Sequence, residues 1–276
     1  MDNTQHGFLT GFQDFWECRP VWESIQNGER RGISMKNLLI LSDIHANLTA
    51  LNQVLDNINV GCIDGIILLG DIVDYGPRTN EVISKIKDIP QQKMLVNIWG
   101  NHEQAVFEGC YKRFSSDRGR RCAALTKASL SEESFGYLSR MNRQGWQELM
   151  VNDKKCLAVH GSLEDVFWKS IDSGNCSELY KEYDYVFSGH SHIPCYMEKF
   201  YEGGSEGYRG KKRTVFLNPG SVGQPRNHNP NANFAVLDIC SGAVSIHSLE
   251  YDYKAEMELF SGQVDVFYRD RLEKGL

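Results

Sequence analysis

Short apolar runs, each followed at once by small and polar residues, recur through the first half of the chain. Residues 38–41, 66–69 and 94–99 are three such runs of strand length. Such runs, bounded by turn residues, are typical of strands buried on both faces of a sheet. The three runs therefore predict three buried strands, each ending in a polar segment.

Helical periodicity fills the intervals between these strands. Apolar residues recur at helical spacing at Leu48, Leu51, Val54, Leu55 and Ile58. Residues 80–89 predict a second amphipathic helix that stops before Pro90. Strand, helix, strand, helix and strand in this order predict β-α-β units, whose parallel strands end at one edge of a sheet.

The pattern changes to strands in the second half of the chain. Residues 155–159 and 185–187 are short apolar runs that again end in polar residues. Four further strands are predicted at 196–200, 214–218, 234–239 and 243–249. Residues 251–276 are polar and are expected to close the domain as a helix or an irregular tail.

Residues 104–150 are more charged and predict a helical cap inserted between the strands. The cap has two open interpretations, a lid over the strand ends or a solvated helical layer without a substrate role. Arg118, Arg120 and Arg121 are expected in a glycine-containing loop of this cap. Ser129, with Glu132 three residues later, is expected to form a capping box at the start of the next helix.

The first 34 residues do not resemble the start of a domain. They are polar and aromatic, and glycines interrupt any long period. One interpretation is an extension whose aromatic side chains pack on the body; the other, which we favour, places the biological start at Met35. The predicted domain spans residues 35–276.

Composition narrows the function classes. The chain has 276 residues, 41% of them hydrophobic, which suits one large domain. It has no apolar run of membrane-spanning length, and its net charge of −6 argues against a dedicated nucleic-acid binder. Eight scattered cysteines without a C-x-x-C pair, and no secretory-signal pattern, favour a cytoplasmic protein.

Polar residues that could bind metals follow almost every predicted strand. They are Asp43 and His45, Asp71 and Asp74, Asn101 and His102, His160, and His190 and His192. Mixed oxygen and nitrogen ligands suit a transition metal. Five strand-end histidines interleaved with carboxylates are difficult to explain as packing, because burying them without a cation would cost desolvation energy. The inventory predicts two metals that share one carboxylate.

Extended geometry at the strand ends would orient these side chains. Asp43 and His45 are two residues apart and would point to the same side of an extended segment. Asn101 and His102 are adjacent and would point to opposite sides. If Asn101 faces the metals, His102 should take another direction.

The ordered motifs D-I-H, G-D-I-V-D, G-N-H-E, H-G and G-H-S-H resemble the calcineurin-like metallophosphoesterase superfamily. They run from Asp43 to His192. D-I-H-A-N, G-D-I-V-D-Y-G-P and L-N-P-G-S-V-G-Q-P-R further resemble its compact prokaryotic phosphodiesterase and diadenosine-tetraphosphatase-like branch. The resemblance implies an α/β fold, a four-layer α-β-β-α sandwich of two mixed sheets flanked by helices.

The resemblance also implies the site. Asp43, His45, Asp71 and His192 would hold one divalent metal, and Asp71, Asn101, His160 and His190 the second. His102, held by Asp74, would be the acid that faces the leaving group. A hydroxide bridging the two metals would attack phosphorus. The metals could be manganese, iron, zinc, nickel or cobalt.

Two departures bear on the substrate. Protein phosphatases and the symmetrical dinucleoside-tetraphosphate hydrolases that resemble them have an arginine soon after G-D, where this chain has Tyr75. Arg226 is a candidate replacement contact for phosphate, or an ordinary surface arginine. Glu103 matches the protein-phosphatase motif but is weak evidence alone.

The implied function is a metal-dependent phosphoesterase acting on a small phosphorylated substrate, either a phosphodiester or a nucleotide-type compound. Two alternatives stay open. One is an inactive interaction scaffold with this fold, and the other is a protein or monoester phosphatase. The scaffold would bind both metals without turning over any phosphoester.

We predict that residues 1–34 are dispensable. A protein that starts at Met35 should fold and hydrolyse phosphoesters like the full chain, because the first predicted strand begins just after that residue. Thermal unfolding of the two proteins measures this. A melting temperature lower by more than ~5 °C in the shorter protein, roughly 1–2 kcal/mol in a domain of this size, would show that the aromatic residues pack on the body.

Overall fold

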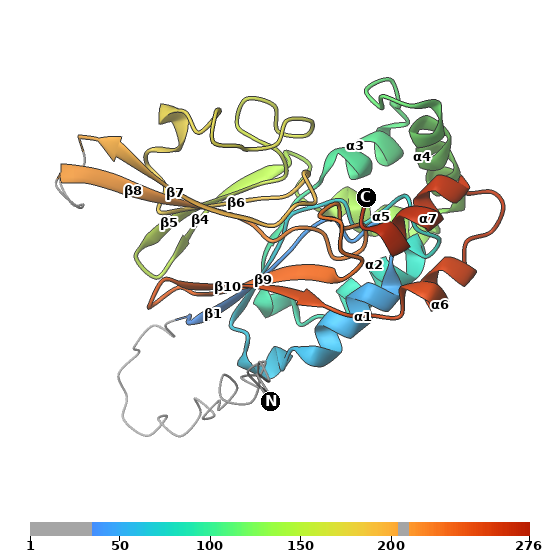
Figure 1. Cartoon of the computed structure of the whole chain (residues 1–276), viewed down its shortest axis with the longest axis horizontal. Helices are drawn as coiled ribbons and strands as arrows, with labels where there is room; N and C mark the ends of the chain where they lie inside the picture. Colours follow the sequence, from blue (N-terminus) through green and yellow to red (C-terminus); the bar gives the residue numbers. More distant parts are fainter. Residues whose placement is uncertain (1–34, 204–209) are drawn as a thin grey trace, which may run out of the picture.

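The computed structural model describes residues 35–203 and 210–276, which form two five-stranded sheets and seven helices (Figure 1). The prediction for residues 1–34 lies outside the described residues. The strands are β1 (Asn37–Leu41), β2 (Gly65–Leu68), β3 (Met94–Asn97), β4 (Trp146–Val151), β5 (Lys154–Val159), β6 (Tyr185–Ser188), β7 (Cys195–Glu202), β8 (Lys211–Asn218), β9 (Ala232–Asp238) and β10 (Ala243–Leu249). The helices are α1 (Leu48–Asn57), α2 (Thr79–Lys87), α3 (Asn101–Glu108), α4 (Asp117–Ser129), α5 (Glu132–Arg140), α6 (Tyr253–Glu258) and α7 (Val266–Lys274).

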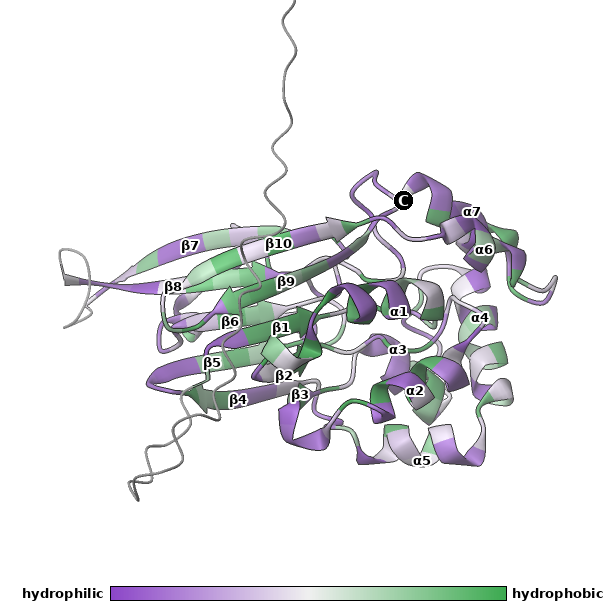
Figure 2. Ribbon diagram, turned by 90° about the horizontal axis from the view of Figure 1, so that it is seen from below, coloured by the Kyte–Doolittle hydropathy of each residue, from purple (hydrophilic) through white to green (hydrophobic). Residues whose placement is uncertain are grey.

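Both sheets are mixed. The first has the strand order β10-β9-β1-β2-β3, with β1, β2 and β3 parallel to one another. The second has the order β4-β5-β6-β8-β7, with β5, β6 and β8 parallel. In Figure 2 the two sheets are stacked and the helices gather toward one end and one side of the stack. The segments that follow the parallel strands are the ones that carry the predicted site residues.

Alternation along β1 explains how the layers are joined. Leu39 and Leu41 point to the helices and pack in the core that contains Leu51 of α1. Leu38 and Ile40 point the other way, into the core between the two sheets. These four leucine and isoleucine side chains are essentially inaccessible to solvent. A strand buried on both faces is continuously apolar, which is the pattern that the sequence showed.

The outer face of the second sheet is covered by an irregular segment. Tyr180 and Tyr183, from the loop around the 3₁₀ turn Glu178–Tyr180, pack on Leu157, Val186 and Phe216. The predicted α/β class with two mixed sheets is confirmed. The predicted helical layer over this face differs: within the described residues, a loop with one short turn covers the second sheet in place of long helices.

Several local expectations within residues 104–150 differ from the structure. Arg118, Arg120 and Arg121 lie in α4 and not in a loop, because Ser116 caps that helix by accepting a hydrogen bond from Gly119 N. Ser129 is the last residue of α4, and the cap of α5 is Ser131. The range expected to be helical also contains the start of β4 at Trp146.

Every helix within residues 35–203 and 210–276 is too short or too polar to cross a membrane.

Candidate metal centre

The predicted site residues lie in the turns that follow the parallel strands. The backbone in these turns is left-handed at residues that carry side chains. The φ angle is positive at Asp43 (53°), His45 (47°), Asp71 (53°), Asp74 (70°), His190 (64°) and His192 (60°). Such conformations are uncommon outside glycine and persist only where surrounding structure enforces them. Their concentration here indicates a functional site.

Two glycines let the ends of β2 and β3 approach each other. Gly70 has a φ of 89°, and a Cβ atom there would lie 2.3 Å from Gly100 N. A Cβ atom on Gly100 would lie 2.1 Å from Asp71 Oδ1. No other residue fits at either position without displacing the Asp71 carboxylate or the backbone beside it.

The first group of converging atoms comes from Asp43, His45, Asp71 and His192, all of them buried. His192 Nε2 lies 3.3 Å from Asp43 Oδ1 and 3.2 Å from His45 Nε2. His45 Nε2 lies 3.7 Å from Asp71 Oδ2. Two ligands at right angles, each about 2.1 Å from one cation, lie about 3.0 Å apart, so this spacing suits a shared ion.

The second group comes from Asp71, His160 and His190, together with the side-chain oxygen of Asn101. His160 Nε2 lies 3.3 Å from Asp71 Oδ2 and 3.0 Å from Asn101 Oδ1. His190 Nδ1 also lies 3.0 Å from Asn101 Oδ1. Asp71 Oδ2 therefore belongs to both groups.

Hydrogen bonds to backbone carbonyls fix the ring orientation of three histidines. Nδ1 of His45 lies 3.1 Å from Val73 O, that of His160 2.8 Å from Leu69 O, and that of His192 2.6 Å from Gln224 O. In a neutral ring, donation from Nδ1 leaves Nε2 with a free lone pair. The Nε2 atoms of His45 and His192 then face each other at 3.2 Å with two lone pairs, an arrangement that a cation would stabilise.

The two buried carboxylates each leave one oxygen without a donor. Asp43 Oδ2 accepts from Ser42 Oγ and His190 N, and Asp71 Oδ1 accepts from His102 N. Asp43 Oδ1 and Asp71 Oδ2 are buried and accept no hydrogen bond. They are the two oxygens that face the histidine nitrogens. Leaving a buried carboxylate oxygen bare is costly, so the donor set fits divalent cations.

The electrostatics of the histidines agree with this arrangement. Burial lowers the pKa of His45 and His192 well below the usual value, which keeps both rings neutral. Burial also lowers the pKa of His190 to about 3. Burial acts in the same direction on His160, but the nearby Asp71 carboxylate outweighs it and raises the pKa of His160 to about 9. Protonated His160 thus balances the negative charge of Asp71, which a bound cation would otherwise neutralise.

His102 stands beside both groups without belonging to either. Its Nδ1 lies 2.7 Å from Asp74 Oδ2, and its Nε2 is 4.0 Å from Asp71 Oδ2. Asp74 Oδ1 in turn accepts from Thr126 Oγ1 of α4. Burial would lower the pKa of His102, but the charges of Asp71 and Asp74 and the Asp74 hydrogen bond raise it overall. The ring therefore favours its protonated form and is held away from the ligand positions.

The geometric route to this placement differs from the one expected. Asp43 and His45 are not extended, and their side chains converge because both residues adopt left-handed backbones. Asn101 and His102 are the first two residues of α3, so their side chains project in different directions around the helix. The extended-strand argument was wrong for both pairs.

Glu103, to which the sequence analysis gave little weight, has a structural role here. It is fully buried, and its carboxylate accepts hydrogen bonds from four backbone N–H groups, those of Asp71, Ile72, Val73 and Gly100. These bonds fix the turn between Asp71 and Asp74 to the start of α3. Its position as the third residue of a helix, where glutamate commonly caps, was the available signal.

Arg226 lies next to the site. Its backbone N–H donates to His192 O at 3.4 Å, and after burial its charge is the next cause that lowers the pKa of His192. Tyr75, which stands where an arginine was expected in other branches, packs against His45 with ring centroids 4.6 Å apart.

Two mixed sheets whose strand ends hold two groups of histidine and carboxylate ligands define a metallophosphoesterase. A model of the calcineurin-like phosphoesterase superfamily domain matches residues 35–242, and the chain belongs to this superfamily. The resemblance drawn from the sequence motifs is thus confirmed.

Relatives cover most of the chain. An uncharacterised protein of Methanocaldococcus jannaschii is 30% identical over 227 residues, which span 80% of this chain and 90% of that protein. The phosphodiesterase YfcE of Escherichia coli is 23% identical over 204 residues, 74% of this chain and 88% of that protein. The crystal structure of a metallophosphoesterase from Sphaerobacter thermophilus matches with a TM-score of 0.69 and 28% identity, covering 88% of this chain and 100% of that one.

We predict that Glu103→Gln destabilises the protein by about 2–5 kcal/mol. Glutamine has one acceptor oxygen, and its amide group would face buried N–H groups that now lose their acceptor, each at a cost of about 1–3 kcal/mol. Urea unfolding measures the change. Glu108→Gln, at an exposed position of the same helix, is the matched control and should change stability by less than about 0.5 kcal/mol. Equal stabilities for the two variants would contradict this role of Glu103.

Proposed function

We propose that this chain is a dinuclear metal-dependent phosphoesterase whose substrate is a phosphodiester or a nucleotide-type compound. The observation that carries the proposal is the pair of buried carboxylate oxygens, Asp43 Oδ1 and Asp71 Oδ2, that face histidine nitrogens and accept no hydrogen bond. We assign Asp43, His45, Asp71 and His192 to one metal, and Asp71, Asn101, His160 and His190 to the other.

When bound, two divalent cations at these positions would stabilise charge on phosphate oxygens and lower the pKa of a water that attacks phosphorus. Mixed carboxylate, amide and imidazole ligands suit manganese, iron, zinc, nickel or cobalt. His45 and His192 contribute by being neutral and preoriented, since burial lowers the pKa of both rings and their Nδ1 atoms are already committed to backbone carbonyls.

His102 supplies the proton. Asp74 holds its Nδ1, so the proton on Nε2 points into the site beside Asp71. A protonated imidazole there can donate to the oxygen that leaves phosphorus, a contribution of about 10²–10⁴-fold. Asp74 is held by Thr126 from the cap helix α4, which ties this acid to the cap.

Two observations support a diester or nucleotide-type substrate. The relative YfcE is a phosphodiesterase. Aromatic side chains also adjoin His102: the buried Phe114 ring lies 5.0 Å from the His102 ring, and the partly buried Trp168 lies 5.3 Å from Phe114, measured between centroids. The exposed part of Trp168 fits an apolar or aromatic group on the leaving oxygen.

The alternatives are less well supported. An inactive scaffold would not need a buried His102, held at 2.7 Å by the Asp74 carboxylate, beside the metal ligands. A protein or monoester phosphatase of the arginine-containing type would need a guanidinium where Tyr75 packs between His45 and Tyr268.

We predict that Asp71→Asn loses at least one metal and lowers turnover at least about a hundredfold, because an amide cannot offer an anionic oxygen to two cations. Elemental analysis of manganese-loaded protein gives the stoichiometry, and bis-p-nitrophenyl phosphate gives the turnover. Two metals per chain with unchanged turnover would refute the assignment.

We predict that His102→Ala keeps both metals and loses about 10²–10⁴-fold in turnover for substrates with poor leaving groups. An activated nitrophenol ester needs no proton and should lose less. Asp74→Asn should show a milder form of the same dependence on leaving group. Loss of a metal from His102→Ala would instead make His102 a ligand.

A further inference from the structure

Three arginines near the metal centre have no aspartate or glutamate partner among the described residues. Arg118, Arg226 and Arg271 form no ion pair with an aspartate or glutamate side chain in the part of the chain that the structure describes. The side-chain Nε of Arg226 is buried and has no hydrogen-bond partner. Leaving a buried guanidinium N–H unpaired is unfavourable. We therefore expect Arg226 Nε to donate to an acceptor that the described part of the chain does not supply.

Helix α7 brings Arg271 to the same place. At one end, Tyr268 stacks on Tyr75 with centroids 4.3 Å apart, and its carbonyl accepts from Gln224 Nε2. At the other end, Gly275 O accepts from His228 N at 2.8 Å. Arg271 lies between these two anchors, one turn after Tyr268 and so on the same face of the helix.

Arg226 and Arg271 are therefore neighbours. Burial and the charge of Arg226 together lower the pKa of Arg271 to about 10, so Arg271 remains cationic near neutral pH. The main-chain oxygen of Leu276, part of the carboxylate at the end of this chain, accepts from Arg271 Nε and leaves the terminal nitrogens of the guanidinium for another acceptor.

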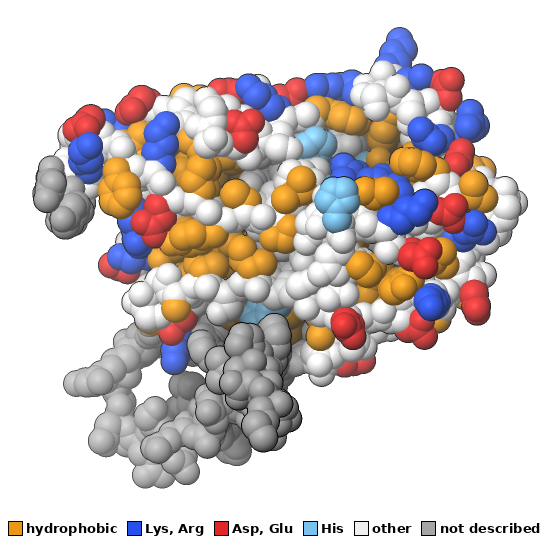
Figure 3. Space-filling model, viewed as in Figure 1, with side chains coloured by type: hydrophobic (Ala, Val, Ile, Leu, Met, Phe, Trp, Pro, Cys, Tyr) orange, Lys and Arg blue, Asp and Glu red, His pale blue; other side chains and the backbone are white. Residues whose placement is uncertain are grey.

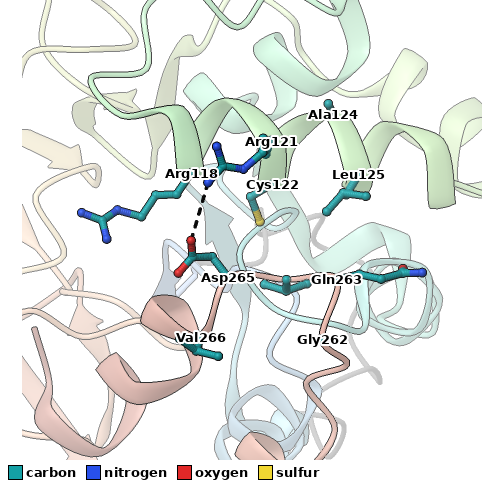
Figure 4. A pocket seen from close by; sticks show the side chains of 10 residues that line it. Arg118, Arg121, Cys122, Ala124, Leu125, Gly262, Gln263, Asp265 and Val266 are labelled. Atoms are coloured by element: carbon teal, nitrogen blue, oxygen red, sulfur yellow. Dashed lines mark ion pairs between the residues drawn. The ribbon is translucent and has the colours of Figure 1, made fainter.

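Arg118 extends this cationic group outward along α7. Its guanidinium lies 4.0 Å from the centre of the Phe267 ring, and that of Arg271 lies 5.2 Å from the same ring. Figure 4 shows Arg118 pointing away from Arg121, which pairs with Asp265 across a cavity of about 640 Å³ between α4 and residues 262–266. Figure 3 shows basic side chains gathered beside a histidine on this face of the molecule.

We infer that Arg226 and Arg271, with Arg118 at the outer end, bind a second phosphoryl group linked to the one at the metal centre. The substrate class is then a phosphate ester with at least two linked phosphoryl groups, such as a nucleoside or dinucleoside polyphosphate. This inference rests on the proposed function, because it places the first phosphoryl group at the metals.

The chemistry of the site supports a phosphoryl group over an uncharged substituent. Gathering three guanidinium groups costs electrostatic repulsion, and only Arg271 has an anionic partner, the main-chain carboxylate of Leu276; a multiply charged anion relieves this repulsion. Guanidinium groups bind phosphate oxygens in pairs and remain charged, unlike lysine at a comparable position. Arg271 lies in α7, outside residues 35–242 that match the superfamily model.

Equilibrium binding tests the inference with a readout other than turnover. Isothermal titration of the manganese-loaded full chain with α,β-methylene adenosine diphosphate and with adenosine monophosphate compares ligands that differ by one phosphoryl group. We expect the first to bind about 10- to 100-fold more tightly, and Arg271→Met to remove most of this difference. Arg271→Lys should restore part of it by keeping the charge.

Arg269→Met is the matched control, because Arg269 lies in the same helix and pairs with its neighbour Asp270. It should leave the preference intact, and circular dichroism should show equal folding of all variants. The ratio of kcat/KM for diadenosine tetraphosphate to that for bis-p-nitrophenyl phosphate should fall in Arg271→Met alone.

The outcomes separate the two proposals. A wild-type protein that hydrolyses no phosphoester would refute the proposed function, while the binding comparison would still decide on the arginines. Equal binding of the two nucleotides by wild type, or an equal loss in Arg269→Met and Arg271→Met, would overturn the inference.

Discussion

The structure depends on two carboxylate oxygens, of Asp43 and Asp71, that are buried without a hydrogen-bond donor. A folded protein seldom leaves such atoms bare, since each would keep a strong bond to water in the unfolded chain. Here both face imidazole nitrogens, and the Nε2 lone pairs of His45 and His192 are also free. Divalent cations would stabilise both groups of atoms, because they replace the missing donors to the carboxylate oxygens and bind the lone pairs of the imidazole nitrogens. The fold is best understood as a frame that holds these atoms together.

The frame acts through backbone as much as through packing. Left-handed residues turn Asp43, Asp71 and His192 inward, and Glu103 fixes one such turn with four backbone hydrogen bonds. The apolar layers on both faces of β1 make these turns rigid by burying the strands that lead into them. Next to this core, Thr126 of α4 donates a hydrogen bond to Asp74, the partner of His102, and α7 carries Arg271.

Much of this could be predicted from the sequence, for reasons that particular residues make clear. Residues 38–41 and 66–69 are apolar on both faces, so they could only be buried strands, and parallel strands bring their following residues to one edge. That placed Asp43 and Asp71 near each other. The turn geometry could not be predicted, because left-handed conformations at His45 or Asp74 are enforced by tertiary contacts and contradict local preference. Glu103 and Arg271 were missed because their partners are distant in sequence, and Arg118 was placed in a loop because Gly119 suggested one.

A crystal structure of the manganese-loaded full chain, with the metals located by anomalous scattering, would show whether Asp71 is shared by two cations. We expect two peaks about 3.5–4 Å apart, both within bonding distance of Asp71 Oδ2, with Asp43 Oδ1 on only one of them. His102 should contact neither. A single peak, or two peaks that leave Asp71 Oδ2 without a cation, would show that Asp71 does not bridge two metals.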